Sequence, residues 1–128
     1  MNNDLVRMAG ESPVDNLVNS TFPPPLTTGI IIRAGQGPLG RGTVMALSSE
    51  SYDFVVLGAA AAGGETLTAS VVLADPFDAS GDEEVPAVAY RAGHFNRPAL
   101  IVAEGYALTR ADEENLRFGG ILLSDALE

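Results

Sequence analysis

His94 is the residue best suited to acid–base chemistry, because it is the only histidine in the chain. A hydrolytic triad would have to use it as the base. His94 follows Gly93 in a segment typical of a turn, and no nearby residues resemble the elbow that presents a catalytic serine. The chain also lacks cysteine, which excludes thiolate catalysis and disulfides. We therefore predict no catalytic residues and no enzyme activity.

Residues 35–40 read Gly-Gln-Gly-Pro-Leu-Gly and match the pattern G-x-G-x-x-G. In a dinucleotide site these glycines let a helix N-terminus approach a pyrophosphate. Here Pro38 interrupts the motif, and residues 42–45 are typical of a strand rather than a helix. The pattern indicates a glycine-rich turn between two strands, and we predict no cofactor.

Residues 75–84 form an acidic segment with five carboxylates. Hard cations such as calcium bind six to eight oxygen atoms, so several ligands are available here. The spacing is not that of a calcium-binding loop, and Asp, Ser and Gly are ordinary loop residues. We predict a solvated loop and no metal site.

The overall charge limits the partners of the chain. Its formal net charge is −10, from 17 acidic residues against 7 arginines, and lysine is absent. Nucleic-acid binding needs clustered cations that release counterions from phosphates, and anionic membranes need the same charge. We expect neither partner. The N-terminus lacks the basic and apolar regions of a signal peptide, which predicts synthesis in a cytosol.

The elements that would position these residues are mainly β-strands. A chain of 128 residues suits one domain, and its 14 glycines and 8 prolines predict many turns. Alternating and β-branched runs predict strands, and small residues predict loops. The predicted strands are 28–33, 41–48, 52–57, 67–74, 85–92, 98–104 and 121–123, with a loop at 59–64 and a turn at 93–96.

One short helix is predicted after Thr109. Thr109 is a good N-cap, Asp112 stands in the capping-box position, and Gly119-Gly120 supplies the end of the helix. So short a helix needs packing to persist, and we expect Leu108, Leu116 and Phe118 to provide it. The predicted fold class is therefore mainly β, or α+β with one short helix.

Residues 1–25 differ from the rest of the chain and end in Pro23-Pro24-Pro25. Three prolines favour an extended backbone without hydrogen-bond donors. We interpret 1–25 as an extended, flexible N-terminal arm with a proline-rich spacer, and 26–128 as the β-rich body. The scattered apolar residues of the arm leave an alternative open, a short amphipathic helix packed on the body.

Four stretches together resemble the head decoration proteins of lambda-like tailed phages. Their order and spacing across residues 39–123 carry the resemblance. They are Leu-Gly-Arg-Gly-Thr-Val-Met at 39–45, Val-Leu-Ala-Asp-Pro-Phe-Asp-Ala at 72–79, Val-Ala-Tyr-Arg-Ala-Gly-His-Phe-Asn at 88–96, and Leu-Arg-Phe-Gly-Gly-Ile-Leu-Leu at 116–123.

The resemblance implies a compact β-rich body that forms homotrimers. It implies that the trimers bind the major capsid protein on the outside of the expanded capsid, at three-fold and quasi-three-fold positions. There they would stabilise the shell against internal DNA pressure, as virion proteins made in the host cytoplasm. In this family the N-terminal arm tends to become ordered against the capsid.

Leu17, Val18 and Phe22 are the residues we expect to contact the capsid, because they are apolar and lie close to the proline spacer. Burial of such side chains would offset the entropy lost when an arm becomes ordered. The alternative function is a trimeric β-rich module that binds a small ligand or a glycan. Glycan sites usually display aromatic side chains, and this chain has no tryptophan and only 6% aromatic residues.

Overall fold

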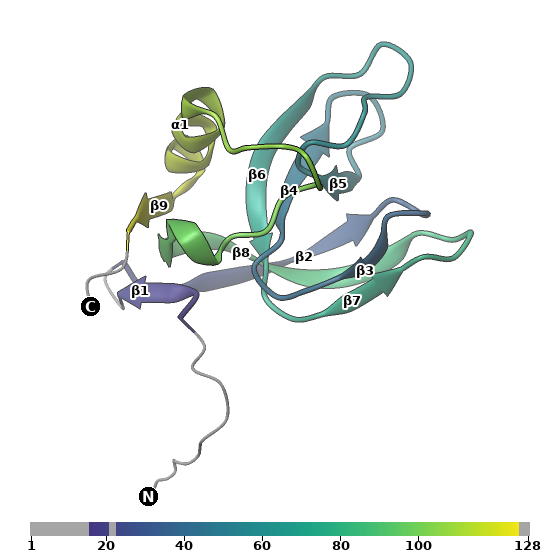
Figure 1. The fold of residues 1–128 in the computed structure, drawn as a ribbon. Helices are drawn as coiled ribbons and strands as arrows, with labels where there is room; N and C mark the ends of the chain where they lie inside the picture. Colours follow the sequence, from purple (N-terminus) through teal and green to yellow (C-terminus); the bar gives the residue numbers. More distant parts are fainter. Residues whose placement is uncertain (1–15, 21–22, 126–128) are drawn as a thin grey trace, which may run out of the picture.

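The computed structural model describes residues 16–20 and 23–125, and it is mainly β with one α-helix, as predicted (Figure 1). The strands follow the alternating and β-branched runs of the sequence, although several boundaries differ from those predicted. The elements are β1 (Val18–Ser20), β2 (Leu26–Ile32), β3 (Gly37–Leu39), β4 (Val44–Ser48), β5 (Phe54–Val56), β6 (Leu67–Leu73), β7 (Phe77–Ala79), β8 (Val85–Asn96), the 3-10 turn η1 (Arg97–Ala99), α1 (Arg110–Gly119) and β9 (Ile121–Ser124).

The body is a small barrel whose strands pair in the order β8, β2, β5, β4 and β6. A further pairing of β6 with β8, through Val72 with Tyr90 and Leu73 with Ala89, closes the ring. Closure removes the free edges that an open sheet of this size would expose. Outside the ring, β1 and β9 both pair with the last residues of β8, and β3 pairs with β7 as a separate ribbon.

Two apolar clusters lie on opposite sides of the barrel wall. The inner cluster gathers alternate side chains of β2, β4, β6 and β8 and is capped by the β3–β7 ribbon. The outer cluster lies between the wall, α1 and β9, and it includes Phe95, Leu116 and Ile121, each 0% exposed. Because successive strand residues point to opposite faces, one strand can supply both clusters.

The helix α1 begins and ends where the sequence predicts. Thr109 caps it and forms the capping box with Asp112, and Gly120 ends it in the left-handed region with φ 108°. Leu116 is buried as expected, but Phe118 is 82% exposed, so the packing role predicted for Phe118 is wrong. In the described part of the chain, no helix is long and apolar enough to cross a membrane.

The predicted turn at 93–96 is wrong, because β8 continues straight through it to Asn96. Gly93 adopts φ 147°, which lets the backbone pass close to the ring of Phe95. Residues 93–96 then pair with β9, while His94 and Phe95 also face β1. The predicted strand at 98–104 is wrong too. Its backbone forms η1 and a single bridge, from Ile101 to Thr43.

Replacing Gly93 with alanine should destabilise the fold. A Cβ atom at this position would lie 2.8 Å from Cζ of Phe95, which is fully buried and cannot move aside. We expect a loss of about 1–3 kcal/mol in the free energy of unfolding, measured by urea denaturation. Gly64→Ala is the control, because a Cβ at Gly64 meets nothing within 4 Å. Equal stability of the two variants would contradict this account of β8.

Candidate functional site

The base of the predicted arm is fixed on the body by β1. Val18 pairs with Phe95 in an antiparallel register, and the backbone N–H of Asn96 donates to the carbonyl of Leu17 at 2.8 Å. The side-chain amide of Asn96 donates to the carbonyl of Asn16 at 2.7 Å. Asn96 is only 2% exposed, so these bonds are shielded from competing water.

The side chain of Leu17 is a core residue of the body. It is 3% exposed and belongs to the outer apolar cluster with Phe95 and Leu116. Gly42 makes room for it, since a Cβ at Gly42 would lie 3.4 Å from Cδ1 of Leu17 and 3.1 Å from the carbonyl oxygen of Ala99. We call the set Leu17, Gly42, Phe95 and Asn96 the arm anchor.

The three residues predicted to contact the capsid are thus placed differently from one another. Leu17 is buried and Val18 is half-buried against the same cluster, while Phe22 lies outside the described residues. Leu17 would have to leave the core to touch a partner. Segment 16–20, inside the predicted arm, packs on the body, and the capsid contacts of all three residues stay predictions.

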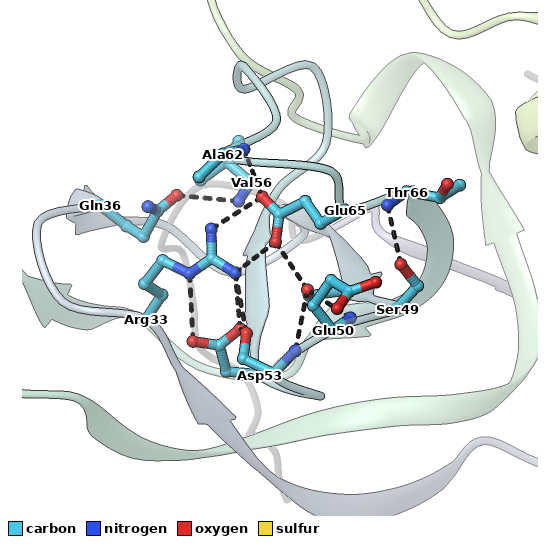
Figure 2. Close-up of polar contacts among 11 residues, drawn as sticks. Arg33, Gln36, Ser49, Glu50, Asp53, Val56, Ala62, Glu65 and Thr66 are labelled. Atoms are coloured by element: carbon cyan, nitrogen blue, oxygen red, sulfur yellow. Dashed lines mark hydrogen bonds and ion pairs between the residues drawn. The ribbon is translucent and has the colours of Figure 1, made fainter.

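A second polar cluster is centred on Arg33, just past the end of β2 (Figure 2). Its guanidinium donates to both carboxylate oxygens of Asp53, at 3.1 and 2.8 Å. It also donates to both oxygens of Glu65, at 3.0 and 2.7 Å. The Glu65 side chain is 3% exposed and that of Asp53 is 14% exposed, so the pairs are partly shielded from solvent. We call these three residues the Arg33 clasp.

The clasp joins segments that are far apart in the sequence. The buried hydroxyl of Ser48 donates to Glu65 at 2.6 Å, and the backbone N–H of Ala62 donates to it at 2.7 Å. Gln36 accepts from the N–H of Val56 close by, at 3.0 Å. The clasp therefore ties the end of β2, the β4–β5 turn and the loop before β6 to one another (Figure 2).

The clasp has the residue types of a catalytic site but not the geometry. Activation of a serine needs a base that accepts its proton, whereas the Ser48 hydroxyl already donates to a carboxylate held by arginine. His94 is elsewhere, with its Nε2 2.7 Å from the hydroxyl of Ser124. The arrangement positions loops and offers no activated nucleophile.

The clasp also changes the acidity of its carboxylates. Hydrogen bonds from Arg33, and then from the Ala62 N–H and Ser48, lower the pKa of Glu65 from its ordinary value of 4.5 to about 2. Hydrogen bonds from Arg33 likewise lower the pKa of Asp53. The two carboxylates in turn raise the pKa of Arg33 above its ordinary value. All three groups therefore stay charged at neutral pH.

The two loop motifs of the sequence come together in space. Residues 37–39 are not part of a turn as predicted but form β3, which pairs with β7 inside the predicted acidic loop. The N–H of Gly35 donates to the carbonyl of Gly81 at 3.1 Å, and that of Gln36 donates to Ala79 at 2.8 Å. In the described residues no group of three or more His, Asp or Glu side chains could hold a metal ion.

Sequence reasoning missed the Arg33 clasp and Asn96. The partners of Arg33 lie 20 and 32 residues away, and no local pattern links them. The sequence predicts a turn at Asn96, whereas its side chain donates to the carbonyl of Asn16, 80 residues earlier in the chain. Only Gly42 carried a signal, since a glycine inside the predicted strand 41–48 indicates a close approach by another segment.

Comparison with known proteins identifies one family. The family model described as bacteriophage lambda head decoration protein D matches residues 8–121. No curated protein matches the chain. The match covers β1 to the start of β9, and so includes both the arm anchor and the Arg33 clasp.

Truncation of Leu17 should weaken the body. Leu17→Ala leaves a cavity beside Phe95 and Leu116, and we expect a loss of about 3 kcal/mol in the free energy of unfolding. Urea denaturation of the full chain measures it. Phe118→Ala is the control, because that side chain is 82% exposed and its loss should change stability by no more than about 0.5 kcal/mol. A Leu17 variant as stable as the control would show that β1 does not hold the core.

The Arg33 clasp predicts sensitivity to acid. The folded-state pKa of Glu65, about 2, lies below its ordinary value of 4.5. The stabilisation is therefore complete above pH 4.5 and is lost as the pH falls toward 2. Glu65→Gln should be less stable at neutral pH and should lose less stability across this range, as followed by thermal unfolding. Glu50→Gln, an exposed neighbour, should behave like the unmodified protein. An unchanged pH profile for Glu65→Gln would refute the clasp as its source.

Proposed function

Because the chain belongs to the family of bacteriophage lambda head decoration protein D, it is a structural protein of the phage capsid surface, and we propose that it acts there as a homotrimer. The proposed position is the outside of the expanded capsid, at three-fold and quasi-three-fold sites. The proposed partner is the major capsid protein, with no nucleic acid or membrane involved. Its proposed role is to stabilise the shell against internal DNA pressure, after synthesis in the host cytoplasm.

The family match is the main support for this proposal. The arm anchor suggests how the arm could transmit force from the shell to the body. A tether resists force only if its base is fixed, and here Leu17 is buried while Asn96 holds the adjacent backbone. Pulling on residues 1–15 would load β1 and β8 rather than a loose linker. In the proposed mechanism Val18 and Phe22 contact the shell, and Leu17 holds the arm to the body.

Binding through the arm has to overcome the entropy of ordering it. Fixing ten residues costs on the order of 10–20 kcal/mol of backbone entropy. Pairing of the arm backbone with a capsid strand and burial of Leu5, Val6 and Met8 would offset this cost. Three arms on one trimer would bind at high effective concentration after the first has bound. The arms would then join several capsid subunits.

Removal of residues 1–15 is the sharpest test of the arm. This truncation keeps Leu17 and β1, so the body should fold as before. Its affinity for expanded capsids that carry no decoration protein should fall at least tenfold, measured by co-sedimentation and by imaging of the capsids. Light scattering should give three chains per particle for both proteins.

The matched control is a truncation of residues 1–25, which also removes Leu17 and β1 and should destabilise the body itself. Capsid binding by the shorter truncation that equals that of the full chain would refute the arm mechanism. A full chain that stays in solution with bare expanded capsids would refute the proposed function.

A further inference from the structure

A groove lies between β3 and the extended segment 101–104 that follows η1. It has a volume of about 540 Å³. Its apolar lining includes Pro38, Leu39 and Ile101, and Ile101 is 46% exposed although it is a large apolar residue. Glu104 is the only charged side chain among the described residues that line it. A groove that is apolar and almost uncharged suits an extended peptide better than a charged ligand.

The segment 101–104 leaves a strand edge open beside this groove. The N–H of Ile101 donates to the carbonyl of Gly42 at 3.0 Å, and its own carbonyl accepts from Val44 at 2.8 Å. Successive residues of an extended segment turn their backbone polar groups to opposite sides, so those of Val102 point away from β4. Within the described part of the chain, neither the N–H nor the C=O of Val102 has a hydrogen-bond partner. Val102 lines the groove and can pair there with another extended backbone.

Gln36 adds a second donor to the lining of the groove. Its side-chain carbonyl accepts from the N–H of Val56 at 3.0 Å, which fixes the side chain in place. Figure 2 shows the amide nitrogen of Gln36 turned away from Val56, and this nitrogen bonds to none of the described residues. It can therefore donate to a bound peptide. The groove thus combines apolar contacts with the free donors and the free acceptor that an extended backbone needs.

We infer that residues 1–15 of the same chain occupy this groove while the protein is free of the capsid. These residues precede the described part of the chain and join it beside the groove. Leu17 packs on Gly42, whose carbonyl accepts from the N–H of Ile101 in the lining. Because β1 runs antiparallel to β8, the chain that leads back from β1 runs past the end of β8 toward η1 and the segment beyond it.

The length of the arm and its tether favour this occupant. The 15 residues of the stretch 1–15 span roughly 50 Å when extended, which is enough to pass along the groove. A tethered segment acts at a roughly millimolar effective concentration, so contacts of modest strength hold it. A segment of another copy lacks this advantage, and it must also approach against the net charge of −10 on each chain.

The composition of the arm matches the groove. Its apolar side chains would face water in the free protein if nothing covered them. They are Leu5, Val6, Met8 and Val14. Arg7 is the only arginine of this stretch, and it complements Glu104 in the lining. One consequence rests on the proposed function: the groove holds the residues that bind the shell, so the shell has to draw the arm out.

Hydrogen exchange of the Val102 amide tests the docking in the full chain. A docked arm would accept from this N–H, so we expect its exchange, followed by NMR, to be roughly tenfold slower than in a protein without residues 1–15. Ala103 is the internal control, because its N–H already donates to Leu57 at 2.9 Å and should exchange equally in both proteins. Equal exchange of Val102 in the two proteins would overturn the inference.

A nitroxide label on the arm shows which copy supplies the segment in the groove. The chain has no cysteine, so Met8→Cys provides a single attachment site. With the label and the NMR isotope on the same chain, the amide signals of Gly35 and Val102 should broaden. With label and isotope on different chains, unfolded and refolded together, these signals should stay sharp. Broadening in the mixed sample would place a neighbour's arm in the groove and overturn the inference, as would sharp signals in both samples.

Ile101→Thr tests whether the groove and the shell compete for the arm. The loss of apolar contact should free the arm, speed exchange at Val102, and raise the affinity for bare expanded capsids about threefold in co-sedimentation. Ile31→Thr is the matched control, because Ile31 is 39% exposed and lies outside the lining of the groove. A lower affinity of the Ile101 variant would mean that the groove contacts the shell directly. Either that result or an unchanged affinity would overturn the inference.

Failure of the docking can be told apart from failure of the proposed function. The exchange and labelling experiments use the free protein, so they decide whether the arm docks even if the full chain does not bind bare capsids. If the full chain binds capsids but Val102 exchanges equally fast with and without residues 1–15, the proposed function stands and only the docking of the arm fails.

Discussion

The structure depends on one long strand that pairs with four others. Residues 85–92 of β8 pair with β2, and Ala89 and Tyr90 also pair with β6, which closes the barrel. Residues 93–96 then leave the barrel and pair with β9, and β1 pairs with His94 and Phe95. Gly93 allows this continuation, because any side chain there would meet the Phe95 ring. A side chain at Gly93 would displace the Phe95 ring and so weaken the pairing of β8 with β1 and β9.

Two arginine clusters stabilise the connections between the strands and the helix. The Arg33 clasp lies beyond the end of β2 and holds the β4–β5 turn against the loop before β6. A second cluster is centred on Arg97, which bonds to Glu113 and Asp125 and so joins η1, α1 and the residue that follows β9. Both clusters use an arginine with two carboxylates, which suits a chain with few cations and many acidic residues.

Local sequence patterns predicted the fold class and the helix. They failed where the conformation of a segment depends on pairing or packing with residues far away in the sequence. Thr109, Asp112 and Gly120 act within one helix, so their capping could be read from spacing alone. The segment 93–96 has the composition of a turn, yet it is a strand because β1 and β9, about 75 and 30 residues away, supply its hydrogen bonds. The burial of Leu17 could not be predicted from local patterns either, because its position beside Gly42 follows from tertiary packing.

The arm anchor lies at the C-terminal end of β8, and this gives a path for force from the arm into the barrel. Load on an arm would enter at Leu17 and Asn96, pass along the backbone of β8, and reach β2 and β6 in the barrel. The hydrogen bonds of an antiparallel pair lie perpendicular to the strands, so a pull along β8 acts on many of them at once. In the proposed role, such a continuous path would transmit load from the shell to the body, and one uninterrupted strand provides it.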